Sequence, residues 1–518
     1  MTISELIETK LEKLQSRIYV PLIIVITIGL FLRIYFTPWH IPSNSPDAFV
    51  YMIEGLSYAK GDFTNISRIL WPLFLSLFFV FFKFEDYIGY MTVMRIVSIC
   101  VSVSTVPVLY LIAKYFVEKK YAIITTVFFI VEPNIIENSI FAISESFFIL
   151  LGLTSFYFII QKNQKYFPIA FIFAALAFDV RLNGIVLFLL LLLVCGIRIK
   201  PLKKKVKTIL IGTAIFLIII SPYIILPIKS GAIPFSIVGE IGNSISKGSM
   251  SVSTYVQSED PSSFSILKNA LKNEFLHIFR ISVPYLVILF PFGVVTALTN
   301  LAYERKILFA VIIISLIIAI PQYTVSNEYR NLFFLTPFLC ILSSIGLQKL
   351  TVSIEMKNIF LVLLMAGLVL LSGYFLLDRY NVDQELVMEK YNLGKYIANN
   401  FQGRIIGHLR LEIIQNMPDI KTGQYFFNQQ LSVADAGITI NTIPKLMEYV
   451  IQNKVDFLVM EDILDEKHYP IFADVFYNEG DFPYLEKVFD SYEHGYKKVK
   501  IKIFKIDYVK YDDFIKQN

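Results

Sequence analysis

The stretch Tyr121–Leu151, YAIITTVFFIVEPNIIENSIFAISESFFILL, decides the fold class. It consists of two apolar runs joined by a short polar break, and its charged residues are Glu132, Glu137 and Glu145 alone. Similar runs recur along most of the chain, and the longest, such as 359–377, approach the ~20 residues that cross a bilayer as a helix. The sequence therefore predicts a polytopic α-helical membrane protein.

Composition agrees with this class. The 518 residues are 55% hydrophobic and 17% charged, whereas about a quarter of the residues of a soluble domain are charged. The formal net charge of +5 is too small to indicate a nucleic-acid partner. The three cysteines, Cys100, Cys195 and Cys340, lie inside apolar runs, so we expect packing roles for them and no disulfide framework.

The distribution of Lys and Arg predicts the topology. The apolar runs are 19–36, 69–82, 91–113, 121–136, 141–160, 167–180, 184–197, 208–228, 278–300, 307–321, 332–348 and 359–377. Basic residues cluster in the N-terminal tail and in the loops at 114–120, 162–165, 198–207, 305–306 and 349–357, which the positive-inside rule assigns to the cytoplasm. This assignment holds only if 69–82 lies along the outer face or returns to it without crossing. About eleven spans follow, with outer-face juxtamembrane helices, a cytoplasmic N-terminus and an extracytoplasmic C-terminal region.

Two parts of the chain are expected from this layout. Residues 1–377 form the transmembrane part, and its first apolar run is a retained helix, because no small-residue cleavage pattern follows it. Residues 378–518 are polar and mixed in charge, with strand-like runs at 404–409, 455–460 and 499–506 that alternate with helical patterns at 386–400, 443–452 and 469–477. This alternation predicts a small α/β domain.

Charged residues at the predicted outer face are the candidate site, because charges beside a membrane are costly to keep. Asp47 follows Pro46 just after the first span, and Tyr51 and Glu54 share its face if the segment is helical. An acidic first turn on a solvated helix would account for Asp47 as well as a catalytic role does. Glu145 begins a span, where the helix dipole stabilises a carboxylate. It has either this structural role or a role in the site.

Three arginines are ambiguous in the same way. Arg181 could close a tight outer turn by pairing with Asp179, or could bind a phosphate through its planar fork. Arg330, before the span at 332–348, could extend to the headgroups or contact a lipid phosphate. For Arg280 and His277 the sequence favours the plainer structural role. One carboxylate as a general base and arginines on a leaving phosphate would together suit transfer from a phosphate carrier.

Several segments resemble the GT-C-type membrane glycosyltransferases, which include the dolichyl-phosphate-mannose protein mannosyltransferases and the lipid A aminoarabinose transferases. The resemblance is carried in order by Asp47, the helix from Tyr51 to Asp62, WPLFLSLFFVFFKF (71–84), Arg95, the stretch 121–151, AALAFDVRLNGIVLFLLLLL (174–193) and EYRNLFFLTPFLCILSSIGL (328–347). The chain departs from the family in two places. Ala48 follows Asp47 where many protein mannosyltransferases have a second acid, and the WWDYG motif of oligosaccharyltransferases is absent.

The resemblance implies a glycosyltransferase that takes a hexose or pentose from a polyprenyl-phosphate donor, with inversion, on the outer face of the cell membrane. By position it implies catalytic roles for Asp47 and Glu145, donor-phosphate contacts for Arg181 and Arg330, and donor or acceptor contacts for Tyr51 and Glu54. The acceptor would be a protein, lipid or glycan. A divalent metal is possible, and no metal ligand is assigned.

Two other functions remain open from the sequence. A flippase or exporter of lipid-linked glycans is the alternative, although internal repeats typical of transporters are lacking. A membrane-anchored binding module would need far fewer spans. The long outer loop at 229–277 is either a lid that closes over the donor or an ordinary disordered loop.

Overall fold

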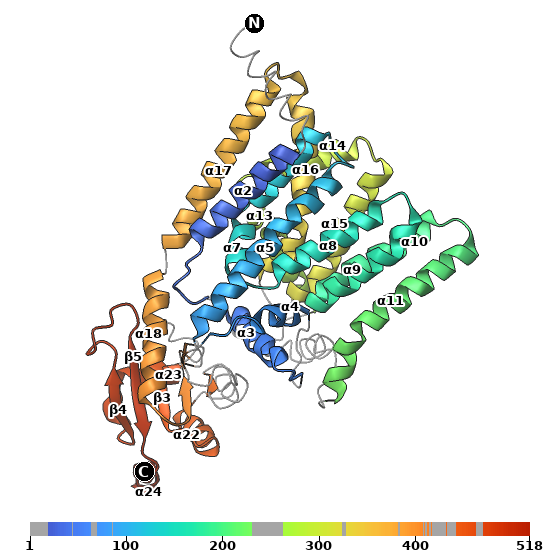
Figure 1. Cartoon of the computed structure of the whole chain (residues 1–518). Coiled ribbons are helices and arrows are strands. Elements are labelled where there is room, and N and C mark those ends of the chain that lie inside the picture. The colour runs from blue at the N-terminus through green and yellow to red at the C-terminus, as the bar shows by residue number, and fades with distance from the viewer. Residues whose placement is uncertain are drawn as a thin grey trace. The chain divides into compact units, whose positions relative to one another are not determined.

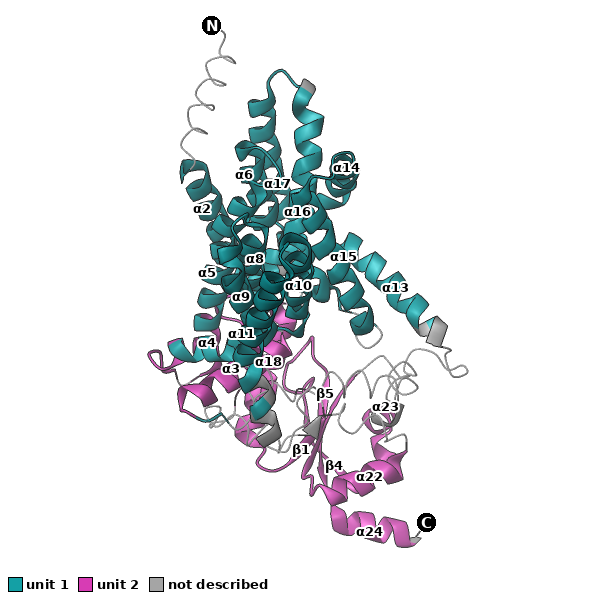
Figure 2. Cartoon of the chain, turned by 90° about the vertical axis from the view of Figure 1, so that its right-hand side faces the viewer, with its two compact units in different colours: residues 1–37, 62–77, 93–379 teal, residues 38–61, 78–92, 380–518 magenta. Residues whose placement is uncertain are grey.

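The computed structural model describes residues 19–43, 45–63, 70–84, 86–229, 263–323, 328–381, 384–407, 409, 412–413, 416, 431–432, 442–462 and 470–517. The chain divides into two compact units (Figure 2). The first unit comprises residues 1–37, 62–77 and 93–379, and the second comprises residues 38–61, 78–92 and 380–518. The divisions near residues 77 and 92 fall inside two helices, α4 (Leu70–Phe79) and α5 (Tyr87–Ala113).

The first unit is built of helices (Figure 1). Besides parts of α4 and α5 they are α2 (Tyr19–Phe36), α6 (Lys119–Ile130), α7 (Pro133–Ile140), α8 (Glu145–Ile160), α9 (Phe167–Val180), α10 (Ile185–Arg198), α11 (Leu202–Lys229), α13 (Ser263–Arg280), α14 (Leu286–Leu298), α15 (Tyr303–Tyr323), α16 (Thr336–Leu350) and α17 (Lys357–Asn381). Three-residue 3-10 turns occur at η1 (Gln164–Tyr166), η2 (Leu182–Gly184) and η4 (Thr351–Ser353), and a longer one at η3 (Tyr329–Leu335).

Six of the described helices are long and apolar enough to cross a membrane, or seven if the bent pair α6 and α7 forms one span. Other apolar helices, among them α8 and α14, are shorter. The predicted class of helical membrane protein is therefore confirmed, and the number of about eleven spans stays a prediction. Helix α4 has ten residues, a length of about 15 Å that is half the ~30 Å of a hydrocarbon core. This length fits a segment that does not cross.

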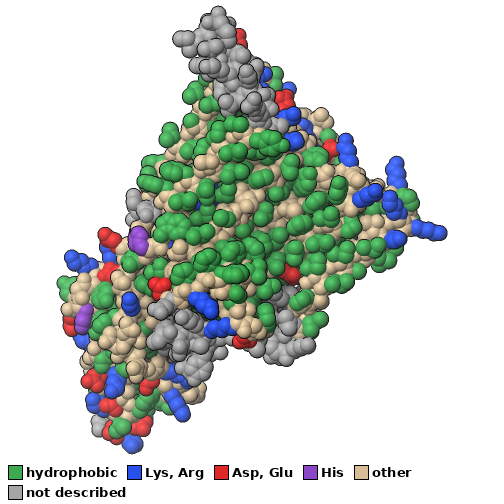
Figure 3. Space-filling model, in the orientation of Figure 1, with side chains coloured by type: hydrophobic (Ala, Val, Ile, Leu, Met, Phe, Trp, Pro, Cys, Tyr) green, Lys and Arg blue, Asp and Glu red, His purple; other side chains and the backbone are tan. Residues whose placement is uncertain are grey.

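Contacts at the helix ends show that the basic loops gather at one end of the first unit. Residues from different helix ends meet there. Tyr115 Oη donates to Gln161 Oε1 (2.9 Å), and Arg198 Nη1 donates to the Gln161 carbonyl oxygen (2.6 Å) while its guanidinium lies over the Tyr303 ring (5.1 Å). The Glu118 backbone N–H donates to Gln348 Oε1 (3.2 Å). In the space-filling view, Lys and Arg gather where α10 joins α11, at the edge of a broad apolar surface (Figure 3). The loops that the sequence assigns to the cytoplasm thus share one end, whereas the side on which that end lies stays a prediction.

Two of the predicted apolar runs are interrupted. The run 121–136 breaks after Ile130, because Pro133 begins α7, which is inclined to α6 by 53°. Glu132 caps the new helix, accepting from Ile135 N at 2.8 Å. The predicted run 278–300 is not one helix either. Helix α13 ends at Arg280, and α14 begins after Pro284, at Leu286.

A fully buried arginine joins the first helix to its neighbours. Arg33, in α2, donates from Nη1 to Gly29 O and Ile130 O, both at 3.0 Å, and from Nη2 to Ser102 Oγ at 3.1 Å. These bonds link α2 to α5 and α6. Glycines let the backbones of two other helices touch: a Cβ added to Gly293 in α14 would lie 1.8 Å from Leu342 O in α16.

The second unit contains α3 (Pro46–Ala59), α18 (Gln384–Asn400), α22 (Ile443–Gln452), α23 (Pro470–Tyr477), α24 (Tyr508–Gln517) and the 3-10 turn η6 (Glu479–Asp481). Its five strands are β1 (Ile405–Gly407), β2 (Leu431–Ser432), β3 (Phe457–Glu461), β4 (Leu485–Asp490) and β5 (Ile501–Ile506). They form one sheet in the order β2-β1-β3-β5-β4, parallel from β2 to β3 and antiparallel at β5 and β4.

Neighbouring residues on a strand face opposite sides of this sheet, and each side has its own apolar core. Leu458 packs with residues of α22 and α23, and Val459 packs with Leu393 and Ile397 of α18. All three predicted strands and all three predicted helices of the C-terminal region are present. The sequence did not reveal β2, β4 or α24.

Candidate active site

Asp47 lies in the first turn of α3, in the second unit. Pro46 opens this helix and Ser45 precedes it in an extended conformation, so the helix begins where the sequence indicated. The Asp47 side chain is half-buried. Tyr51 and Glu54 follow on the same helix face and are 1% and 6% exposed. These two side chains are therefore buried in the second unit. The alternative interpretation, an acidic first turn on a solvated helix, required them to be exposed.

Glu145 and Arg181 form an ion pair in the first unit. Glu145 is the first residue of α8, and Arg181 follows the last residue of α9, so two neighbouring helices bring the charges together. The side chains are 2% and 13% exposed, respectively. The alternative pair of Arg181 with its sequence neighbour Asp179 is not the one that forms. The buried Oε2 atom of Glu145 has no hydrogen-bond partner among the described residues.

Amide side chains extend this pair toward η3. Arg181 Nη2 donates to Asn331 Oδ1 at 3.4 Å, and Asn183 Nδ2 donates to the Asn331 carbonyl oxygen at 3.4 Å. Asn183 also bonds to Gln322 near the end of α15. The network therefore ties α8, α9, α15 and η3 together at one end of the helical unit, opposite the end that carries the basic loops.

Arg330 lies in η3 and forms an ion pair with Glu328, and both side chains are partly exposed. Beside it, the Arg280 guanidinium of α13 stacks over the Tyr329 ring, 4.1 Å from the ring centroid. The segment 329–331 therefore brings three arginines to one place. Arg330 belongs to it, Arg280 stacks on Tyr329, and Arg181 donates to Asn331. We call these three side chains the arginine cluster. The sequence interpretation missed Arg280, because it assigned that residue a plainer role.

Helix α13 also brings a buried acid and a buried imidazole to this end of the first unit. Glu274 and His277 are 5% and 7% exposed, and Glu274 Oε1 and His277 Nδ1 lack hydrogen-bond partners within the described part of the chain. The His277 ring packs edge-on against Tyr323, with 5.2 Å between the centroids. Burial raises the pKa of Glu274 to about 7, and burial together with the Arg280 charge lowers the pKa of His277. From the sequence, residues 229–277 are expected to form a loop, so Glu274 was not singled out.

The predicted site residues therefore fall into two groups. Glu145, Arg181 and Arg330 share one end of the first unit, and Asp47, Tyr51 and Glu54 share α3 of the second. Among the described residues, no group of three or more His, Cys, Asp or Glu side chains could hold a metal ion. Residues 230–262, most of the predicted lid, lie outside the described residues.

Sequence and structure comparisons agree on one fold. Residues 69–226 match the family model of the dolichyl-phosphate-mannose-protein mannosyltransferases. No curated protein sequence matches the chain.

The structure resembles two solved membrane enzymes over most of its length. The apo oligosaccharyltransferase of Archaeoglobus fulgidus is 11% identical, with a TM-score of 0.58, over 86% of this chain and 69% of that one. ArnT from Cupriavidus metallidurans, solved with undecaprenyl phosphate, is 11% identical, with a TM-score of 0.57, over 93% of this chain and 97% of that one. The partial family match and the similarity over nearly the whole chain identify this protein as a membrane protein with the fold of the GT-C-type glycosyltransferases.

Proposed function

We propose that the protein transfers a sugar from a polyprenyl-phosphate donor to an acceptor on the outer face of the cell membrane. The observation that carries the proposal is the arginine cluster around residues 329–331, at the end of the helical unit opposite the basic loops. Arginine forks bind phosphate oxygens in two-point contacts, so three of them suit a lipid-phosphate headgroup. The solved relatives support this chemistry, since ArnT was crystallised with undecaprenyl phosphate and the archaeal oligosaccharyltransferase was solved with a dolichol-phosphate.

The reaction is one displacement at the anomeric carbon. Asp47 acts as the general base and takes the proton of an acceptor hydroxyl or amine. The acceptor atom bonds to the anomeric carbon from the face opposite the phosphate, which inverts the configuration. The bond from the anomeric carbon to the phosphate oxygen breaks, and polyprenyl phosphate leaves with the electron pair. Arg181 and Arg330 stabilise the negative charge that grows on this oxygen.

The ion pair gives Glu145 a part in this scheme. Its Oε1 atom orients Arg181, and its Oε2 atom can accept one further hydrogen bond, from the acceptor or the sugar. We assign Tyr51 and Glu54 to the support of α3 and to contacts with the donor or acceptor near Asp47. Whether the sugar is a hexose or a pentose, and whether a divalent metal assists, is decided by the assay below.

The test is a transfer assay on the purified full-length chain, with a panel of polyprenyl-phosphate hexoses and pentoses and a panel of peptide, lipid and glycan acceptors. Free polyprenyl phosphate is the product measured, with and without a metal chelator. We expect release with one donor class, and its loss in Asp47→Asn. Asp481→Asn, which changes an exposed acid of the same unit, is the matched control and should retain the wild-type rate.

Two outcomes would contradict the proposal. An Asp47→Asn variant with full activity would remove Asp47 as the base. Movement of a lipid-linked glycan across liposomes by the purified protein, with no transfer to any acceptor, would support the flippase or exporter instead.

A further inference from the structure

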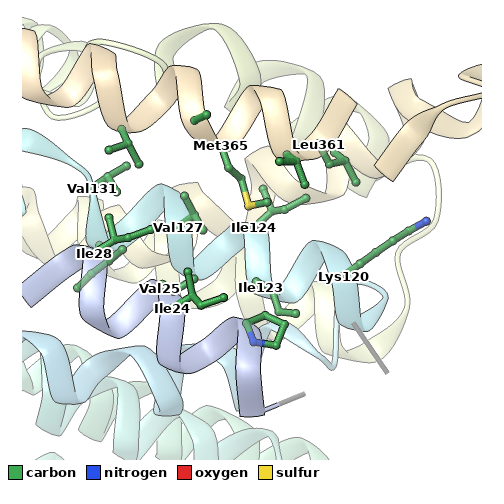
Figure 4. A pocket seen from close by; sticks show the side chains of 15 residues that line it. Ile24, Val25, Ile28, Lys120, Ile123, Ile124, Val127, Val131, Leu361 and Met365 are labelled. Carbon is green, nitrogen blue, oxygen red and sulfur yellow. The ribbon is translucent and has the colours of Figure 1, made fainter. Parts of the chain in front are cut away.

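A long apolar groove runs between α2 and α17, and α6 forms its floor (Figure 4). Its volume is about 340 Å³. All its lining residues are apolar except Lys120, which lies at one end and extends beyond the groove. This groove takes no part in the site described above.

Both walls of the groove are fastened to its floor at the end away from Lys120. Gly29 of α2 lies against Ile130 of α6 so closely that a Cβ on the glycine would be 2.1 Å from the Ile130 side chain. The hydrogen bonds of Arg33 to Gly29 O and Ile130 O hold this contact. On the other wall, Ser372 of α17 donates to Val131 O. The groove is therefore closed near residues 130–131.

At the other end of the groove the described residues are basic. Lys119 and Lys120 begin α6, and Lys357 begins α17 one turn before Leu361, which lines the groove. The nearby acid Glu118 is engaged with Gln348, bonded through Oε1 at 3.1 Å. A cationic mouth on an apolar cavity fits a ligand with an anionic head and a single apolar chain.

The depth of the groove selects the kind of chain. From Lys120 to Val131 the floor spans eleven residues, or about 16 Å at 1.5 Å per residue, which is close to half the ~30 Å hydrocarbon core. This is the depth of one leaflet. A polyprenyl-phosphate donor is a poorer candidate, because the arginine cluster that would hold its phosphate lies at the opposite end of the same unit.

We propose that this groove binds one acyl chain of an anionic phospholipid, with the lipid phosphate at Lys119 and Lys120. The positive-inside rule assigns this end to the cytoplasmic leaflet. A lipid tail is surrounded by hydrocarbon before and after it enters the groove, so the apolar walls bind it by van der Waals packing and not by the hydrophobic effect. The lysines supply the preference for an anionic headgroup. The lipid fills the gap between the first and last helices of the first unit and holds them together.

The experiment compares phosphatidylglycerol with phosphatidylcholine of identical chains, added to the purified full-length protein in detergent. Retained lipid is measured by native mass spectrometry, and protein stability by thermal unfolding. We expect phosphatidylglycerol to be retained at least about fivefold better and to raise the unfolding temperature more. The double variant Lys119→Gln, Lys120→Gln should lose this preference, whereas Lys203→Gln, Lys205→Gln, a matched change in another basic loop, should keep it.

A second variant tests the chain-binding part. Ala366 is exposed and lines the groove from α17, so Ala366→Phe should fill the space and lower retention of both lipids while the protein stays folded. Equal retention of the two lipids by the wild-type protein would overturn the proposal, as would a preference that survives loss of both lysines. Lipid binding that appears only after residues 2–18 are deleted would show that the chain's own N-terminal segment occupies the groove, and would also overturn it.

Discussion

Arg181 donates a hydrogen bond to the carboxylate of Glu145, 36 residues earlier in the sequence, and this bond fixes the direction of an arginine at the start of the arginine cluster. Both members of the pair are largely buried, so removal of either one would leave the other charge buried without its partner. The two residues therefore act as a unit, and their variants should reveal this.

Glu145→Gln and Arg181→Lys should not have additive effects. Each single variant is expected to lower the rate of transfer about 10- to 100-fold, and the double variant is expected to be close to the worse single one, a coupling of ~1–3 kcal/mol. The check is a double-mutant cycle on kcat/KM for carrier release. Arg305→Lys, at a half-buried arginine outside the cluster that donates to the Asn300 carbonyl oxygen, serves as the control. Additive losses would show that the ion pair does not orient Arg181.

Arg280 should contribute to donor binding and not to the chemical step. It stacks on Tyr329 beside Arg330, at a place where it can add charge near a phosphate. Arg280→Ala is therefore expected to raise KM for the donor about fivefold with little change in kcat, the pattern of a lost uniform binding contact. Arg280→Lys should recover part of this affinity. A fall in kcat at saturating donor would place Arg280 among the groups that act in the transition state.

Glu274 makes the protein less stable as pH rises. The pKa of Glu274 is raised from 4.5 to about 7, so the stabilising protonated form is fully present below about pH 4.5 and is lost as pH rises through about 7. We expect Glu274→Gln to match the wild type in thermal stability near pH 4.5 and to exceed it increasingly up to about pH 7. Asp378→Asn, at an exposed acid, should show no such trend. A constant difference across this range would mean that Glu274 titrates normally.

The crossing of α14 and α16 should tolerate no side chain at Gly293. Its Cβ would meet Leu342 O at 1.8 Å, and backbone cannot move aside as a flexible side chain can. Gly293→Ala is expected to lower the unfolding temperature of the purified protein by several degrees, a typical result of about 1–3 kcal/mol of overpacking. Gly196→Ala, where the added methyl group meets open space, is the matched control. Equal stability of the two variants would show that the helices can separate without loss.

The sequence was sufficient to predict features that depend on a local pattern of residues. Apolar length indicated the membrane helices, and alternation in the C-terminal region indicated β1, β3 and β5. It was insufficient where a contact joins distant segments. Nothing near Arg181 in the sequence favours Glu145 over Asp179 as its partner, because that choice depends on how α8 packs against α9. Arg280 and Tyr329 are likewise far apart in the chain, and α13 was hidden in a region that reads as a loop.

The bonds of Arg33 have a consequence for how the chain is made. The first helix enters the membrane with a guanidinium in its last turn, where the cost of insertion is lower than the about 2.5–3.5 kcal/mol of a charge at the helix centre. Two of its acceptors arrive later, 69 residues on at Ser102 and 97 residues on at Ile130. A nascent chain that stops before α5 therefore carries an unsatisfied charge, and its first helix should be the segment most readily removed by membrane quality control. Synthesis through α6 ends this exposure, so the order of translation determines when the amino-terminal span becomes secure.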